Sequence, residues 1–298
     1  MRRRLMSFSV CYFKTPLAMD QVTVSLSSCF NRLPHPDTRF EQLKMQTWDQ
    51  LKRKTPRLFN ASKFRLQQIT LTPSDHHSLL TLHLGITDYA SYVGMCCSSL
   101  TSQLVKDGEQ LHGDRFAFLS RKVGVAAVVE TVDGHVALIK RSKNVGLYQN
   151  MYDTPGGHPE PSNIQLTEDS LHMLKDKKKT EMEKAARREF FQSIVHEVHE
   201  ELNVAPELQQ LPMLLGVVLQ TDACTPSFSF HIKIKCSAHE LKELYKAGPM
   251  DKFESVELEF LTVENLLMEG STILEELQLT PSAKGTLEMW KQHTLQAK

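Results

Sequence analysis

The stretch His196-Glu197-Val198-His199-Glu200-Glu201-Leu202-Asn203-Val204 places three carboxylates close together in the chain. An α-helix turns about 100° per residue, so Glu197, Glu200 and Glu201 fall on about one third of its circumference. Apolar residues line the other side, at Phe191, Val195, Val198 and Leu202. The pattern predicts an amphipathic helix with one face in a core and one acidic face.

Three carboxylates on one helix face repel one another. Like charges one turn apart cost roughly 0.2–0.5 kcal/mol on an isolated helix. A hard divalent cation bound by oxygen atoms would offset this repulsion. The alternative is a solvated acidic surface, and the acidic face alone leaves both interpretations open.

A pair of glycines lies upstream of this helix, in Tyr152-Asp153-Thr154-Pro155-Gly156-Gly157. It follows a β-hairpin pattern, in which strands at 124–132 and 135–140 flank Asp133-Gly134, a dipeptide typical of a type I′ turn. Two adjacent glycines let the backbone approach a ligand closely. The glycine pair therefore favours a metal site on the acidic face.

The glutamate helix and the glycine pair together resemble the motif of the Nudix hydrolases, G-x5-E-x7-R-E-U-x-E-E-x-G-U, in which U is an aliphatic residue. Gly157 matches its first glycine. The second half of the motif is matched at Glu197, Val198, Glu200, Glu201 and Val204. The resemblance implies a metal-dependent hydrolase of phosphoric anhydrides.

The chain departs from that motif at several positions. His196 stands in place of its Arg, and Asn203 stands in place of its last Gly. The middle Glu is missing, because Arg188 occupies its place. Glu189 is one residue away and lies within about 20° of Glu200 around the helix, so it could serve on the same face.

The order of the remaining elements is similar to that of the Nudix fold. Three β-rich segments follow the helix, at 214–220, 227–236 and 256–263. Lys284 to His293 then predicts a closing helix. The implied fold class is α/β: a Nudix α/β/α sandwich with a mixed sheet, spanning 119–298, with an insertion at about 160–185.

A smaller N-terminal α/β unit is predicted at 19–118. Alternating apolar residues predict its strands, at 22–26, 64–71 and 79–84. Asp37 is the expected N-cap of a helix that continues to Lys54. Thr87 is the expected N-cap of a second helix, which carries Tyr89.

Residues 1–18 contain basic residues and no acidic residue. We expect a disordered N-terminal extension there, with Met19 as the working start of the protein. A mitochondrial transit segment is the alternative. The six cysteines form no CxxC pair, which favours a reduced, cytoplasmic protein over a disulfide framework or a zinc site.

The composition argues against several partners. The formal net charge is zero, so no overall field draws the chain to nucleic acid or to an anionic membrane. We find no apolar run of the length needed to cross a bilayer. The lysine run at 175–179 is expected to be a solvated loop or helix cap, with RNA contact as the sharper alternative. The sequence does not indicate an oligomeric state.

Within the Nudix family the chain resembles the UDP-sugar hydrolases. The similarity lies at 63–66 (Lys-Phe-Arg-Leu), 84–89 (Leu-Gly-Ile-Thr-Asp-Tyr), 156–161 (Gly-Gly-His-Pro-Glu-Pro) and 281–285 (Pro-Ser-Ala-Lys-Gly). It implies hydrolysis of UDP-glucose or UDP-galactose to UMP and the sugar 1-phosphate, with Mg²⁺ as cofactor and Mn²⁺ as a substitute. Two alternatives stay open: a Nudix hydrolase of ADP-ribose, a dinucleotide or capped RNA, and a Nudix fold that binds a ligand without catalysis.

The resemblance also implies roles for the acidic face. Glu197 and Glu201 are the expected principal metal ligands, Glu200 is a third, and the Gly156 carbonyl is a backbone ligand. All three glutamates are catalytic candidates, and either Glu200 or Glu201 would hold the attacking water. His196 either donates a hydrogen bond to these carboxylates or is a surface residue without a role.

Five residues are expected to contact the substrate. Arg141 is the first candidate for the phosphate, because a guanidinium fork matches phosphate oxygens, and Lys284 is the second. Gly157 would let the substrate lie close to the backbone. The ring of Phe64 or Tyr89 would stack on uracil, with Tyr92 as a further aromatic candidate, and the alternative for all three is a place in the core.

Overall fold

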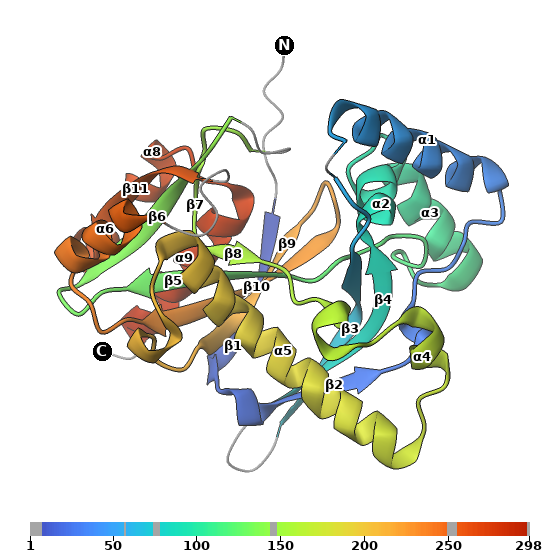
Figure 1. The fold of residues 1–298 in the computed structure, drawn as a ribbon, viewed down its shortest axis with the longest axis horizontal. Helices are drawn as coiled ribbons and strands as arrows, with labels where there is room; N and C mark the ends of the chain where they lie inside the picture. The colour runs from blue at the N-terminus through green and yellow to red at the C-terminus, as the bar shows by residue number, and fades with distance from the viewer. Residues whose placement is uncertain (1–7, 57, 74–77, 144–147, 249–254, 297–298) are drawn as a thin grey trace.

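A computed structural model describes residues 8–56, 58–73, 78–143, 148–248 and 255–296. Figure 1 shows two sheets, one built mainly from later parts of the chain and a smaller one from its beginning. A long helix, α5 (Asp176–Leu202), packs against strands of both sheets. This helix carries the glutamates that the sequence singles out.

The larger sheet has eight strands of mixed direction. Its order is β1-β9-β10-β5-β6-β11, with β7 beside β6 and β8 beside β5. β10 and β5 run parallel, and the other pairs run antiparallel, which confirms the predicted mixed sheet. The strands are β1 (Phe8–Leu17), β5 (Gly124–Glu130), β6 (His135–Arg141), β7 (Tyr152–Asp153), β8 (Gly156–Gly157), β9 (Met213–Gln220), β10 (Thr225–Lys233) and β11 (Ser255–Thr262).

Helices cover both faces of this sheet. Alternate residues of a strand point to opposite faces. Val125 and Ala127 of β5 therefore lie in the core that includes α5, whereas Val128 lies in a second core with α9. Helix α9 spans Pro281–Gln296. The predicted α/β/α sandwich is confirmed.

The apolar side of α5 anchors it to the sheets. Phe190, Ile194 and Val198 are buried at steps of four residues. Val195, which was expected on this side, is only half-buried. Asn203 ends the helix with φ 59°, a left-handed conformation that Asn tolerates better than most residues. The Asn in place of the motif's last Gly is therefore compatible with the same helix end.

The smaller sheet has the order β2-β4-β3, with β2 parallel and β3 antiparallel to β4. Its elements are β2 (Val22–Leu26), β3 (Ser62–Pro73), β4 (Ser78–Asp88), α1 (Thr38–Lys54), α2 (Tyr89–Ser91), a π-helical turn (Tyr92–Cys96) and α3 (Thr101–His112). Asp37 caps α1, as predicted, by accepting a hydrogen bond from the Arg39 N–H. Leu80 and Leu82 share a core with α5, and the domain boundary near residue 118 stays a prediction.

Residues 8–17 form a strand and not a disordered extension. β1 pairs with β9, and Phe13 and Leu17 are buried. The prediction of disorder is wrong for this segment because its hydrogen-bonding partner lies far along the chain, where local composition gives no sign of it. Residues 1–7 lie outside the described part of the chain.

Two further predictions are wrong, one about a turn type and one about a helix N-cap. Gly134 has φ 74°, but Asp133 has no positive φ, so the hairpin turn is not type I′. Asp88, and not Thr87, caps α2, because its carboxylate accepts a hydrogen bond from the helix backbone (2.8 Å). The turn at 74–77, which contains two histidines, lies outside the described residues.

Much of the insertion is folded. A 3₁₀ turn, η4 (Pro161–Ile164), and α4 (Glu168–His172) fill its first half. Helix α5 begins at Asp176, so the lysine run at 175–179 forms a helix start, as the cap interpretation expected. The other helices of the described chain are η1 (Met19–Gln21), η2 (Ser28–Phe30), η5 (Pro206–Leu208), α6 (Ala238–Ala247), α7 (Val263–Leu267) and α8 (Ile273–Glu276). No helix in the described ranges is long and apolar enough to span a membrane.

Candidate active site

The carboxylates near the end of α5 meet the glycine strand β8. The Gly156 N–H donates a hydrogen bond of 2.8 Å to Oε2 of Glu201. A Cβ atom built on Gly157 would overlap the carboxylate of Glu197, so a side chain there would displace that group. The two glycines thus allow the close approach that the sequence predicts, although the closest group is a carboxylate of the chain itself.

The three glutamates differ in their exposure to solvent. Glu201 is only 4% exposed, Glu197 is half-buried, and Glu200 is exposed. A buried carboxylate needs hydrogen-bond donors or a cation to offset its lost hydration. The Gly156 N–H supplies one donor to Glu201, and the same side chain is oriented toward the glycine strand. Exposure to solvent therefore increases across the acidic cluster, from Glu201 to Glu197 to Glu200.

Their arrangement fits a hard divalent cation. Among the described residues, no set of three His, Cys, Asp or Glu side chains is assembled as a complete metal centre. Mg²⁺ does not require such a set, because it commonly takes one or two protein carboxylates and keeps several waters. Glu197 and Glu201 lie one turn apart on α5 and both face β8. In an extended strand the N–H and C=O of one residue project to the same edge, so the Gly156 carbonyl lies on the Glu201 side.

Glu189 does not extend the acidic face. It is 5% exposed, and its Oε1 accepts hydrogen bonds of 2.9 Å from the Glu160 N–H and the Asn163 side chain. This carboxylate anchors the inserted loop to α5. His196 is exposed and makes no polar side-chain contact within the described part of the chain, which favours the surface interpretation.

Arg141 is held by an acidic partner. Its guanidinium lies 3.1 Å from Oδ2 of Asp153. Oδ1 of Asp153 accepts hydrogen bonds from the Thr280 hydroxyl (2.7 Å) and the Thr154 N–H (3.0 Å). Burial raises the pKa of Asp153 in spite of the Arg141 charge. Arg141 therefore lies at the end of β6 as predicted, but its charge is matched, and phosphate contact by it stays a prediction.

The other predicted substrate contacts are dispersed. Phe64 is 1% exposed and belongs to the core, so its assignment to uracil is wrong: its position on β3 directs the ring inward. Tyr89 is half-buried and packs edge-on against Trp48, with 6.1 Å between ring centroids. Lys284 lies on α9, which covers the opposite face of the larger sheet from α5. The structure does not bring these residues together around the glutamates.

A cluster of basic residues next to β8 was missed from the sequence. The Lys122 side-chain nitrogen forms a hydrogen bond with Nε2 of His158 and lies 4.2 Å from the centre of the Tyr92 ring. Beside it, Lys63 forms an ion pair with Glu160. Both lysines are only 8% exposed. Lys63 and His158 lie in segments that resemble UDP-sugar hydrolases, but a single lysine such as Lys122 has no signal of its own.

Burial dominates the electrostatics of this cluster. Desolvation lowers the pKa of Lys122 from an ordinary value of 10.5 to about 7. Desolvation, together with the Lys122 charge, also holds the pKa of His158 well below its usual range. The titratable and charged groups that face Lys122 are Lys63, His158, Tyr92, Cys96 and Cys97. Among the residues that the structure describes, no carboxylate belongs to this set.

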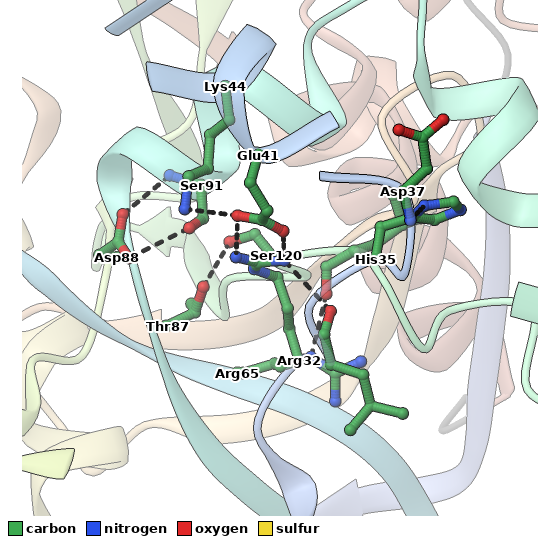
Figure 2. A network of polar contacts seen from close by, with 12 residues as sticks. Arg32, His35, Asp37, Glu41, Lys44, Arg65, Thr87, Asp88, Ser91 and Ser120 are labelled. Carbon is green, nitrogen blue, oxygen red and sulfur yellow. Dashed lines mark hydrogen bonds and ion pairs between the residues drawn. The ribbon is translucent and has the colours of Figure 1, made fainter. Parts of the chain in front are cut away.

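A cavity of about 520 Å³ lies elsewhere, between the smaller sheet and the inserted loop. Arg32, Thr87, Asp88 and Ser91 line it and also belong to the polar network in Figure 2. Arg32 forms an ion pair with Glu41 (2.6 Å), and the Ser91 N–H donates to Asp88 (2.8 Å). These polar groups already have partners in the chain, and the glutamates of α5 are not among the residues that line this cavity.

The chain belongs to the Nudix hydrolase family, which confirms the resemblance inferred from the motif. It is 31% identical over 278 residues to the uridine diphosphate glucose pyrophosphatase NUDT22 of Mus musculus, covering 93% of this chain and 87% of that protein. It is also 31% identical over 258 residues to Nudix hydrolase 9 of Arabidopsis thaliana, covering 85% of this chain and 81% of that protein. No protein-family model matches the chain.

Solved structures resemble the chain more weakly. The crystal structure of DR0079 from Deinococcus radiodurans has a TM-score of 0.35 and 17% identity, covering 56% of this chain and 80% of that one. The Ap4A hydrolase of C. elegans has a TM-score of 0.32 and 14% identity, covering 58% of this chain and 98% of that one.

Proposed function

We propose that this protein is a Mg²⁺-dependent hydrolase that splits the diphosphate bond of UDP-glucose or UDP-galactose into UMP and the sugar 1-phosphate. The observation that carries the proposal is the contact of Glu197 and Glu201 with the glycine strand. The substrate class is supported by the relative in Mus musculus, whose name is uridine diphosphate glucose pyrophosphatase and which matches over most of both chains.

We assign different roles to the three glutamates of α5 according to their exposure to solvent. Glu201, buried and fixed by the Gly156 N–H, and Glu197, packed over Gly157, would hold the cation together with the Gly156 carbonyl. When bound there, Mg²⁺ would neutralise phosphoryl oxygens and lower the pKa of a bound water. Glu200 is exposed and free of these backbone contacts, so it is the better candidate to accept a proton from the attacking water.

A panel of nucleotides tests the substrate class. UMP release is measured from UDP-glucose and UDP-galactose, and phosphate-ester release from ADP-ribose and a dinucleoside tetraphosphate, each with Mg²⁺ or with chelator. We expect metal-dependent turnover of the UDP-sugars and little of the others. Turnover of ADP-ribose without turnover of the UDP-sugars would contradict the proposed substrate class but not the proposed site.

A variant series tests the site in the same assay. Glu197→Gln and Glu201→Gln should each lower kcat by about 100-fold or more, the scale of losing one charge-stabilising group. Glu181→Gln is the matched control, because Glu181 is an exposed glutamate on the same helix. Equal activity of all three variants would contradict the assignment of the site.

A further inference from the structure

We propose that Lys122, a buried cation next to the segment that follows the glycine strand, binds a phosphate group of the substrate's diphosphate. This inference rests on the proposed function and adds a recognition residue to the same site. It concerns a residue that the Nudix motif does not contain. The argument depends on the position of Lys122, on its charge and on its neighbours.

The position of Lys122 connects it to the acidic face through one short segment. Lys122 pairs with Arg65 in an isolated β-bridge, so it lies where the two sheets meet. Its ammonium contacts His158, which directly follows the glycine strand. Gly156, at the other end of that segment, binds Glu201. The cation and the carboxylates therefore flank the same few residues of backbone.

The charge of Lys122 is not balanced by the protein. Within the described ranges it makes no ion pair, whereas the neighbouring Lys63 is paired with Glu160. An ammonium that is 8% exposed loses most of its hydration, which costs several kcal/mol unless a counter-charge is present. A bound anion would supply that counter-charge. The low pKa of Lys122 reflects the same imbalance in the free protein.

Neither neighbour gives Lys122 a sufficient structural reason to be there. The contact with the Tyr92 ring offsets only part of the desolvation cost, because a cation over an aromatic face is stabilised less than burial destabilises it. The contact with His158 is made to another base, whose own protonation would add a second positive charge. A lysine kept only for packing could be replaced by an apolar side chain of similar length.

The chemistry of the site selects phosphate as the anion. A lysine binds phosphate oxygens as a compact point charge. Arg141, the residue that the sequence suggested for this task, is already paired with Asp153. A diphosphate that reached the cation held by α5 would bring several negative oxygens close to β8, the strand next to Lys122.

Calorimetric binding tests this role with UDP and with inorganic pyrophosphate, both in the presence of Mg²⁺. Lys122→Met should weaken binding of each by about 10- to 100-fold, the range for losing one hydrogen bond to a charged group. The control is Lys140→Met, because Lys140 is a less buried lysine on β6 of the larger sheet that is already paired with Glu257. We expect that control to bind both probes as the wild type does.

Thermal unfolding distinguishes a role of Lys122 in phosphate binding from a role in stabilising the fold. Because Lys122→Met removes an unpaired buried charge, it should leave Tm unchanged or raise it while affinity falls. A lower Tm with unchanged affinity for pyrophosphate would overturn the proposal. If Lys122→Met does not fold, Lys122→Gln takes its place with the same expected loss of affinity.

The outcomes distinguish this proposal from the proposed function. A wild type that hydrolyses UDP-glucose, with Lys122→Met equal to it in affinity for UDP and pyrophosphate, overturns the role of Lys122 alone. A wild type that binds pyrophosphate through Lys122 but does not hydrolyse UDP-glucose supports the role of Lys122 and overturns the function. A folded wild type that binds neither probe overturns the role of Lys122.

Discussion

The backbone N–H of Gly156 donates a 2.8 Å hydrogen bond to Oε2 of Glu201, which ties strand β8 to the end of α5 across the insertion. The adjacent Gly157 lies directly against Glu197. Glu201 is thus positioned by a backbone N–H, and Glu197 lies where any side chain at position 157 would overlap it. This gives a physical reason why the site can tolerate His196 where the family motif has Arg: the orientation of the glutamates does not depend on that side chain alone.

Gly157→Ala should disable the site without unfolding the protein. The added Cβ would overlap the Glu197 carboxylate and force it away from β8. We expect a loss of activity of about 10-fold or more, because small displacements of positioned groups are costly. The control is Gly124→Ala, whose Cβ would lie 3.5 Å from its nearest neighbours. Equal activity of the two variants would contradict the role given to the Glu197 position.

Arg141→Met should destabilise the fold. It removes the cation from Asp153, a carboxylate whose side chain is 15% exposed and which keeps its hydrogen bond from Thr280. We expect the free energy of unfolding to fall by about 1–3 kcal/mol in urea denaturation. Lys140→Met breaks the more exposed pair with Glu257 and should lower the free energy of unfolding less than Arg141→Met does. An Arg141→Met variant as stable as wild type would show that the ion pair between Arg141 and Asp153 does not stabilise the fold.

Glu189→Ala should release the inserted loop. The substitution removes the acceptor for the Glu160 N–H and the Asn163 side chain, so both donors lose their bond to α5. We expect faster proteolysis at 160–167, measured by limited digestion and mass spectrometry. Glu181→Ala, an exposed change on the same helix, serves as control and should be cleaved like the wild type. An unchanged digestion pattern for Glu189→Ala would contradict the anchoring role.

Because Lys122 is buried, we expect the difference in stability between Lys122→Met and wild type to depend on pH. Its pKa is about 7 in the folded protein and ordinarily 10.5, so the unfolded chain binds this proton more tightly. Protonation therefore destabilises the fold, fully below about pH 7 and less as the pH rises toward the unfolded value. Lys122→Met removes this penalty. Its stability relative to wild type should be highest near about pH 6 and decline toward about pH 9, and a difference independent of pH would contradict the unpaired charge.

The sequence was most informative where local pattern and tertiary environment agree. The hairpin of β5 and β6, the Asp37-capped helix and the glutamate helix all follow from periodicity and capping. In each case the signal lies within a few turns or a single strand pair. The glycine pair was singled out for close approach to a ligand, which stays a prediction; its close neighbours in the structure are β5 at Gly156 and Glu197 at Gly157.

The features that the sequence did not predict depend on contacts between distant segments of the chain. β1 is a strand because β9 offers it hydrogen bonds, and nothing within residues 8–17 indicates that partner. Glu189 is occupied by a loop that the family motif lacks. Lys122 becomes notable only when two sheets meet and exclude water from it. Arg141 was correctly placed at a strand end, but its pairing with Asp153 was not visible in the pattern.

The most direct test of the central claim is phosphorus NMR of UDP-glucose incubated with Mg²⁺ and either wild type or Glu201→Gln. We predict that the diphosphate signals give way to those of UMP and glucose 1-phosphate with the wild type, and persist with the folded variant. Diphosphate signals that remain intact with folded wild type and Mg²⁺ would contradict the proposed hydrolysis. Equal conversion by Glu201→Gln would contradict the site.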